Sequence, residues 1–143
     1  MKETALLGLV LVASFACTPQ GQAPPADPSE VEAAARAFLD HAHAFDYVAM
    51  RAAATSDFEI LIFGRRMDLD AFEAFLREME ESRGGEELGT YDLLDLQTEI
   101  VGNVAYTSWA STDWLEAAVF VRSGDQWLID RAFAMPVEAT PQP

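Results

Sequence analysis

The sequence predicts an α+β fold in which three N-terminal helices pack on one face of an antiparallel sheet. Two observations support this class. Apolar residues recur at helical spacing in the first half of the chain, over residues 29–50 and 68–79. From residue 94 to residue 134, apolar and polar residues alternate between short turn sequences. The 143 residues, half of them apolar, suit one domain with short appendages.

The charge balance narrows the classes of partner. The chain has 9 Lys and Arg residues against 24 Asp and Glu residues, a net charge of -15. Such a surface repels phosphate backbones, so nucleic-acid binding is disfavoured. The acidic residues are spread along the chain, which is more typical of a solvated surface than of a cation site. No motif in the sequence is diagnostic of a particular reaction, and we expect no cofactor.

The N-terminal segment "MKETALLGLVLVASFAC" has the pattern of an export signal. Lys2 precedes an apolar run from Ala5 to Ala16, which is too short for an ordinary transmembrane helix. The segment resembles a bacterial lipoprotein signal, in which the cysteine, here Cys17, becomes the lipidated first residue. The resemblance implies an exported domain that touches the membrane only through a lipid anchor in the cell envelope. Secretion without a lipid is the alternative, since Ser14 and Ala16 also suit a cleavage site.

The single cysteine excludes an intramolecular disulfide framework. After residues 1–17, the proline-rich segment 18–29 reads as a disordered, flexible tether. The folded domain then spans residues 30–136, and residues 137–143 form a flexible tail.

The first helix is predicted to begin at a capping box formed by Ser29 and Glu32. Its apolar stripe comprises Val31, Ala35, Phe38, Ala42 and Phe45. Asp46 then begins a second, shorter helix.

A strand over residues 57–63 and a turn over 64–66 lead to the third helix, which Asp68 caps. Its apolar stripe comprises Phe72, Phe75, Leu76 and Met79.

Four strands are predicted in the second half, with turns at residues 102–103, 111–113 and 123–125. If the last two turns have three residues each, Trp109 pairs with Leu115, and Val121 pairs with Trp127. A row of side chains then crosses three strands on one face: Tyr106, Ala118 and Asp130. A register shifted by one residue would exchange the faces.

The last two strands carry a family resemblance. In "EAAVFVRSGDQWLIDRAF", a strand is followed by a short turn with Gly124 and a closing strand with Trp127, and "VGNVAYTSW" precedes it. With the order of elements, these segments resemble the nuclear-transport-factor-2-like (NTF2-like) superfamily, which includes SnoaL-like polyketide cyclases and ketosteroid isomerase. The resemblance implies a cone-shaped barrel: a strongly bent sheet wraps the first helix and leaves a pocket at its wide end.

The resemblance does not fix a function, because this fold hosts both enzymes and domains that only bind or dimerise. The catalytic positions of ketosteroid isomerase fall near Phe38, Ile60 or Leu61, and Ala118. All of these residues are apolar, so we expect the isomerase chemistry to be absent.

Placing the row with Tyr106 and Asp130 inside the cone gives candidate catalytic groups. Desolvation would raise the pKa of Asp130 and suit acid–base work with Tyr106 or His41. The alternative is that Asp130 only accepts a hydrogen bond from Tyr106 or pairs with an arginine. His41 and His43 are two positions apart on a helix and cannot share a metal ion, so no metal site is expected. We expect His43 to face solvent.

Other residues are candidates for lining the pocket. The predicted ligand-binding residues are Phe38, Trp114, Glu116, Ala118 and Phe120. The opposite face of the sheet is also apolar and is expected to form a homodimer through Trp109, Trp127 and Phe133, with Arg131 at its rim.

The sequence therefore predicts an exported SnoaL-like domain that binds a small apolar ligand and dimerises. One alternative is an enzyme of the cyclase, isomerase or dehydratase type that uses a pocket carboxylate. The other is a structural interaction module of the cell envelope, in which side chains such as Phe38 and Phe120 fill the cavity.

Overall fold

A computed structural model describes residues 27–89 and 91–137. The helices are α1 (Pro28–His43), α2 (Tyr47–Ala52) and α3 (Leu69–Ser82). The strands are β1 (Ala54–Ile62), β2 (Arg65–Asp68), β3 (Leu94–Val101), β4 (Val104–Ala110), β5 (Trp114–Ser123) and β6 (Gln126–Pro136). Four predicted features lie outside the described residues: the signal peptide, the lipidation of Cys17, the tether up to residue 26 and the tail beyond residue 137.

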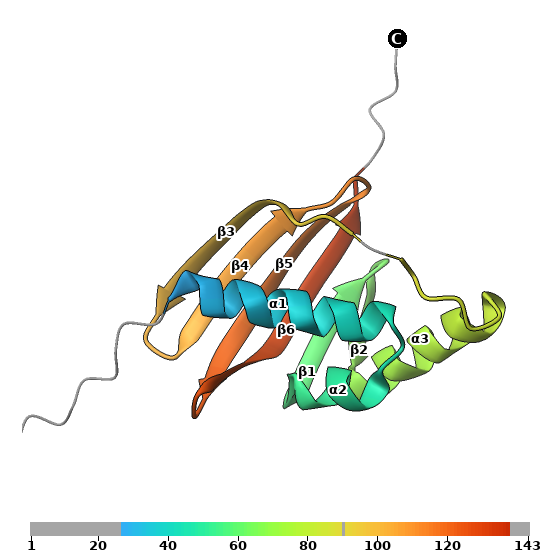
Figure 1. The fold of residues 1–143 in the computed structure, drawn as a ribbon, viewed down its shortest axis with the longest axis horizontal. Helices are drawn as coiled ribbons and strands as arrows, with labels where there is room; N and C mark the ends of the chain where they lie inside the picture. The colour runs from blue at the N-terminus through green and yellow to red at the C-terminus, as the bar shows by residue number, and fades with distance from the viewer. Residues whose placement is uncertain (1–26, 90, 138–143) are drawn as a thin grey trace, which may run out of the picture.

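The six strands form one curved, unclosed sheet in the order β2-β1-β6-β5-β4-β3 (Figure 1). Helix α1 crosses one face of it, and α2 and α3 lie beside β1 and β2. The predicted α+β class is thus confirmed. The pairing of β1 with β6 is parallel, so the sheet is not wholly antiparallel as predicted. Parallel strands are not joined by a short turn, so the sequence contains no turn motif that would predict this pairing. No helix in the described ranges is long and apolar enough to cross a membrane.

Helix α1 buries the predicted stripe against the sheet, with Val31, Ala35, Phe38 and Ala42 almost inaccessible to solvent. It begins earlier than predicted. Asp27 is the N-cap and accepts a hydrogen bond from the Ser29 backbone N–H at 3.0 Å. Pro28 occupies the first turn, where its missing N–H is not needed. The capping box predicted at Ser29 and Glu32 is therefore wrong.

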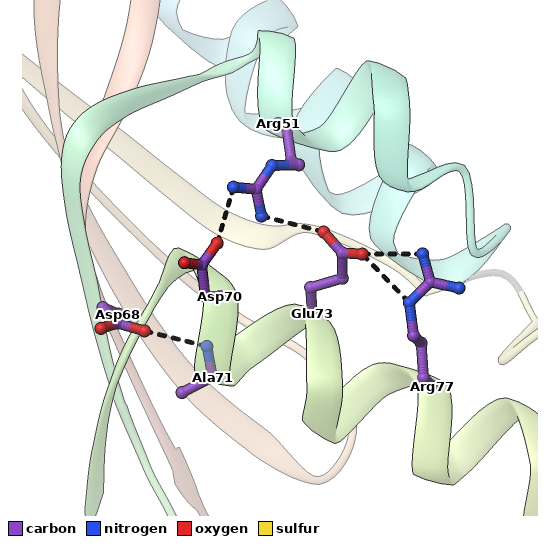
Figure 2. A network of polar contacts seen from close by, with 6 residues as sticks. All are labelled: Arg51, Asp68, Asp70, Ala71, Glu73 and Arg77. Carbon is purple, nitrogen blue, oxygen red and sulfur yellow. Dashed lines mark hydrogen bonds and ion pairs between the residues drawn. The ribbon is translucent and has the colours of Figure 1, made fainter.

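The caps predicted for the other helices are confirmed. Asp46 accepts a hydrogen bond from the Ala49 N–H at 3.1 Å, and Asp68 accepts one from the Ala71 N–H at 2.9 Å (Figure 2). Each carboxylate satisfies a backbone donor that has no partner within its helix.

A polar network joins α2 to α3. Arg51 on α2 contacts Asp70 at 2.6 Å and Glu73 at 2.9 Å, and Arg77 contacts Glu73 at 2.7 Å (Figure 2). The hydrogen bond with Arg77, and then that with Arg51, lowers the pKa of Glu73 despite some desolvation. Exposed pairs of this kind each contribute about 0.2–1 kcal/mol, so the network orients α3 more than it stabilises the fold.

The turns set a register that differs from the prediction by one residue. Gly102 and Asn103 form the predicted two-residue turn, with Val101 paired to Val104. The turn between β5 and β6 has two residues, and the loop between the paired residues Ala110 and Leu115 has four. Because neither has the three residues assumed, the two predicted pairings are wrong. The pairs observed instead are Trp109 with Glu116 and Val121 with Leu128.

A β-bulge in β6 contains Asp130. Val119 pairs with Arg131, while the next residue, Phe120, pairs with Ile129, so Asp130 is an extra residue without a partner on β5. The bulge breaks the alternation of side chains. Trp127 and Ile129 are buried before it, whereas Arg131 and Phe133 after it are exposed on the outer face.

The inner face of the sheet consists of cross-strand rows directed at the helices. One row joins Thr107, Ala118 and Ala132, and the next joins Trp109, Glu116 and Ala134. The packed core contains side chains that are fully buried. The largest of these are Phe58, Phe120, Met50, Ile129 and Val31.

Candidate ligand pocket

A cavity of about 430 Å³ lies between helices α1 and α3 and the inner face of the sheet. Helix α1 contributes Phe38, and α3 contributes Phe72, Phe75, Leu76 and Met79, the whole stripe predicted for that helix. The sheet contributes residues of β1, β4, β5 and β6. The walls are therefore mainly apolar and aromatic, as in most sites for small molecules.

Among the described residues that line this cavity, Glu116 is the one carboxylate. The register places it on the inner face of β5, between Trp109 on β4 and Ala134 on β6. The indole Nε1–H of Trp109 donates a hydrogen bond to Glu116 Oε2, as expected for directly opposed residues on neighbouring strands. Burial raises the pKa of Glu116, and the Trp109 hydrogen bond opposes that rise. The site thus holds one carboxyl group in surroundings that disfavour its charge.

Tyr91 and His43 form the polar side of the cavity. The ring of Tyr91 lies 4.5 Å from that of His43, and His43 Nδ1 lies 2.9 Å from the Gly89 carbonyl oxygen. The Tyr91 hydroxyl donates to the Arg36 carbonyl oxygen at 3.2 Å. Burial, followed by the nearby Asp40 carboxylate, raises the pKa of Tyr91 far above neutrality. Tyr91 is therefore a neutral phenol at physiological pH.

The position of His43 differs from the expectation that it faces solvent. His43 is half-buried and lines the cavity, whereas His41 is not among the lining residues. The segment around Leu88 folds back over the last turn of α1, where the Leu88 N–H donates to the His43 carbonyl oxygen at 3.0 Å. This cover comes from a distant part of the chain, so helical spacing alone could not show it.

Two aromatic side chains contact each other at one side of the cavity. Phe63 lies in the turn between β1 and β2, at a φ of 53° followed by Gly64 at 71°. Its ring meets Trp114 edge-on at 5.0 Å, and 57% of Phe63 is exposed. A left-handed backbone is uncommon for a phenylalanine, and two successive positive φ angles are typical of a tight hairpin turn.

The predicted ligand-binding residues divide into two groups. Phe38, Trp114 and Glu116 line the cavity. Ala118 and Phe120 also lie on the inner face, but they are buried in the packed core and do not line it.

The structure does not bring together the predicted catalytic residues. Tyr106 pairs with Val119, is 49% exposed and lies on the outer face, so the predicted row of Tyr106, Ala118 and Asp130 is wrong. Asp130 does not line the cavity. Its carboxylate accepts a hydrogen bond from Thr55 Oγ1 at 2.7 Å and contacts Arg131 Nη1 at 3.1 Å. The catalytic roles of Asp130, Tyr106 and His41 stay predictions without support from their positions.

The predicted dimer face also needs correction. Trp109 and Trp127 are each 6% exposed and belong to the inner core, whereas Phe133 is 39% exposed on the outer face. The single-residue error in register and the bulge at Asp130 together account for the exchange of faces.

A second, more open cavity of about 400 Å³ involves Tyr106, Gln97 and Asp95. The two cavities adjoin, because they share four lining residues: Trp109, Glu116, Ala117 and Phe133.

No protein-family model matches the sequence, and no curated protein matches it either. Solved structures do resemble the fold. The hub homology domain of CaMKII from Chlamydomonas reinhardtii has a TM-score of 0.63 at 13% identity and covers 77% of this chain and 98% of its own.

Two further structures of similar fold are a putative dehydratase and a putative ketosteroid isomerase. A putative dehydratase of the NTF2-like family from Streptomyces avermitilis has a TM-score of 0.62 at 18% identity, covering 78% of this chain and 96% of its own. A putative ketosteroid isomerase from Parabacteroides distasonis has a TM-score of 0.60 at 14% identity, covering 78% and 88%. At these identities the likeness concerns the fold alone: the described domain has the curved-sheet fold of NTF2-like proteins.

Proposed function

We propose that this domain binds a small apolar ligand in the cavity between α1, α3 and the sheet. The observation that carries the proposal is an aromatic-lined volume of about 430 Å³, within the roughly 300–1,000 Å³ range of small-molecule sites. The few polar side chains of the described lining, Glu116, Tyr91, His43 and Ser111, are suited to orienting a ligand rather than solvating it.

The same observation argues against a purely structural module with a filled interior. Phe120 is fully buried in the core and Phe38 forms part of the cavity wall, yet a volume of about 430 Å³ stays open. Empty apolar volume costs stability, by about 24 cal/mol per Å³ in cavities made by truncating core residues. Binding a ligand is a reason for the fold to retain such a volume.

Filling the cavity tests this proposal. Ala132 lies on the inner face between Ala118 and Ile60 and lines the cavity, so Ala132→Phe places a ring inside it. The control is Ala74→Phe on the exposed side of α3. With 1-naphthylmethanol as a neutral aromatic probe, calorimetry should show binding to the wild type and to A74F, and binding weakened at least about tenfold in A132F. Equal binding by folded A132F would contradict the proposal.

We also propose that the domain forms a homodimer through the outer face of the sheet. Exposed apolar side chains gather on this face of β4, β5 and β6: Tyr106, Leu115, Phe133 and Met135. Two structures of similar fold are described as a hub homology domain and an association domain, which supports self-association as a use of this architecture. Large apolar patches usually mark interfaces.

A charge on this face tests the dimer. Met135→Glu, at an exposed outer-face position that does not line the cavity, should shift a dimer to a monomer in analytical ultracentrifugation at micromolar concentration. Val48→Glu, at an exposed position of α2, should not. A wild-type monomer at that concentration would contradict the dimer and leave the ligand site untouched.

Export and lipid anchoring remain part of the proposal and rest on residues 1–17 alone. Metabolic labelling with a fatty acid should mark the wild type but not Cys17→Ser. Equal labelling of the two proteins, or none of the wild type, would contradict the lipid anchor.

A further inference from the structure

We propose that the cavity selects an apolar amine, whose ammonium group pairs with Glu116 while its apolar part occupies the aromatic walls. This inference rests on the proposed function, because it names the chemical class of ligand for the same cavity.

The charges of the lining residues disfavour an anionic ligand and favour a cation. No lysine or arginine lines the cavity in the described part of the chain, and its ionisable groups are Glu116, His43 and the neutral phenol of Tyr91. The net charge of the whole chain is -15. An acidic protein raises the local concentration of cations, and an anion entering this cavity would meet a carboxylate and no fixed positive charge.

Glu116 has capacity for one more strong partner. Its Oε2 accepts the Trp109 indole N–H, while Oε1 has no hydrogen-bond partner within residues 27–89 and 91–137. Burial disfavours the charged carboxylate, and an adjacent cation would restore it. An ammonium donates hydrogen bonds and also neutralises the charge, whereas an alcohol only donates a hydrogen bond.

The neighbours of Glu116 suit a cation as well. The Trp109 N–H donates to the carboxylate, so the indole meets Glu116 with its edge and leaves the rest of the carboxyl group to a cation. Tyr91 and Trp114 line the same cavity. Aromatic faces attract ammonium groups within about 6 Å, and the attraction strengthens when the contact is desolvated. The rest of the cavity is apolar and takes the hydrocarbon part of the ligand.

Three probes with the same ring system test the inference by calorimetry at pH 7.5. They are 1-naphthylmethylamine, 1-naphthylmethanol and 1-naphthoate, which are cationic, neutral and anionic. For the wild type we expect the amine to bind at least about tenfold more tightly than the alcohol, and the carboxylate to bind most weakly.

Two variants locate the effect. Glu116→Gln should reduce the affinity for the amine about tenfold and change the affinity for the alcohol less than about twofold. Glu99→Gln removes the same charge from an exposed position on β3 and should leave all three affinities unchanged. Circular dichroism checks that both variants are folded.

The outcomes separate the two proposals. If the alcohol binds the wild type as tightly as the amine, the amine inference is overturned and the proposed binding function stands. If E116Q and E99Q weaken amine binding equally, the overall charge rather than Glu116 selects the cation, and the inference is also overturned. If none of the three probes binds, the proposed function itself fails.

Discussion

Glu116 and Asp130 are carboxylates on neighbouring strands, each surrounded by apolar sequence, and the structure gives them different environments. Asp130 is the extra residue of a bulge and has two partners, the Thr55 hydroxyl and the Arg131 guanidinium. Glu116 occupies a regular position facing the cavity and, within the part of the chain that the structure describes, has one side-chain partner, Trp109. A carboxylate whose oxygens are hydrogen-bonded within the domain has a structural role. A carboxylate that lines a cavity and has an oxygen without a hydrogen-bond partner is available to bind a ligand.

The largest expected effect concerns the bulge itself. Deleting Asp130 removes a residue that has no partner on β5, so the side chains on either side keep their faces. Deleting Ala132 instead moves Phe133 and Ala134 to the opposite faces. We expect the second deletion to abolish cooperative thermal unfolding and the first to retain it at a lower Tm. If neither deletion variant folds, the claim that Asp130 can be removed without changing the faces of the flanking side chains is contradicted.

Asp130→Ala should destabilise the domain by about 1.5–3 kcal/mol, because it removes hydrogen bonds to a charged group and leaves Thr55 and Arg131 without that partner. Urea denaturation measures the change. Asp92→Ala, at an exposed position, is the control and should change the stability by less than about 0.5 kcal/mol. If D130A is as stable as the control, Asp130 does not stabilise the domain and the structural role is contradicted.

Thr55→Val should cost about 1 kcal/mol, since it keeps the shape of the side chain and removes the hydroxyl that donates to Asp130. Ser56→Ala is a neighbouring exposed control. In a double-mutant cycle, the effects of T55V and D130A should be less than additive, because each removes the same hydrogen bond. Simple additivity would mean that the two side chains do not interact.

Glu116→Gln should have the smallest effect on stability, and its sign should depend on pH. The folded-state pKa of Glu116 is raised, so the native protein binds more protons than the unfolded chain above the unfolded pKa of about 4.3. The wild type should therefore lose stability relative to E116Q as the pH rises from about 4 through the raised pKa. Urea midpoints of both proteins at pH 4 and pH 7 measure this. If the wild type instead gains stability relative to E116Q between pH 4 and pH 7, the raised pKa of Glu116 is contradicted.

The sequence predicts well what depends on neighbouring residues and poorly what depends on distant ones. The apolar stripes and the caps Asp46 and Asp68 are local features, and they are confirmed. The inner position of Glu116 follows from alternation within β5 and is also correct. The faces of Tyr106 and Trp109 depend on the length of a loop, and an error of one residue exchanges them.

The sequence failed to predict the lining residues His43 and Phe63 for the same physical reason. His43 and Phe63 join the lining because segments far apart in sequence meet around α1 and α3. No spacing within one element signals such a meeting. The sequence predicted a turn at Gly64, but neither the strand β2 that follows it nor the contact of Phe63 with Trp114.

The three tryptophans allow the most direct test of the central claim, that the cavity beside Glu116 binds an apolar ligand. Trp109 and Trp114 line the cavity, whereas Trp127 is buried in the core away from its walls. In a ¹H–¹⁵N correlation spectrum titrated with 1-naphthylmethanol, the indole signals of Trp109 and Trp114 should shift and that of Trp127 should stay in place. A shift of Trp127 alone, or no shift of Trp109 and Trp114 at saturation, would contradict the account.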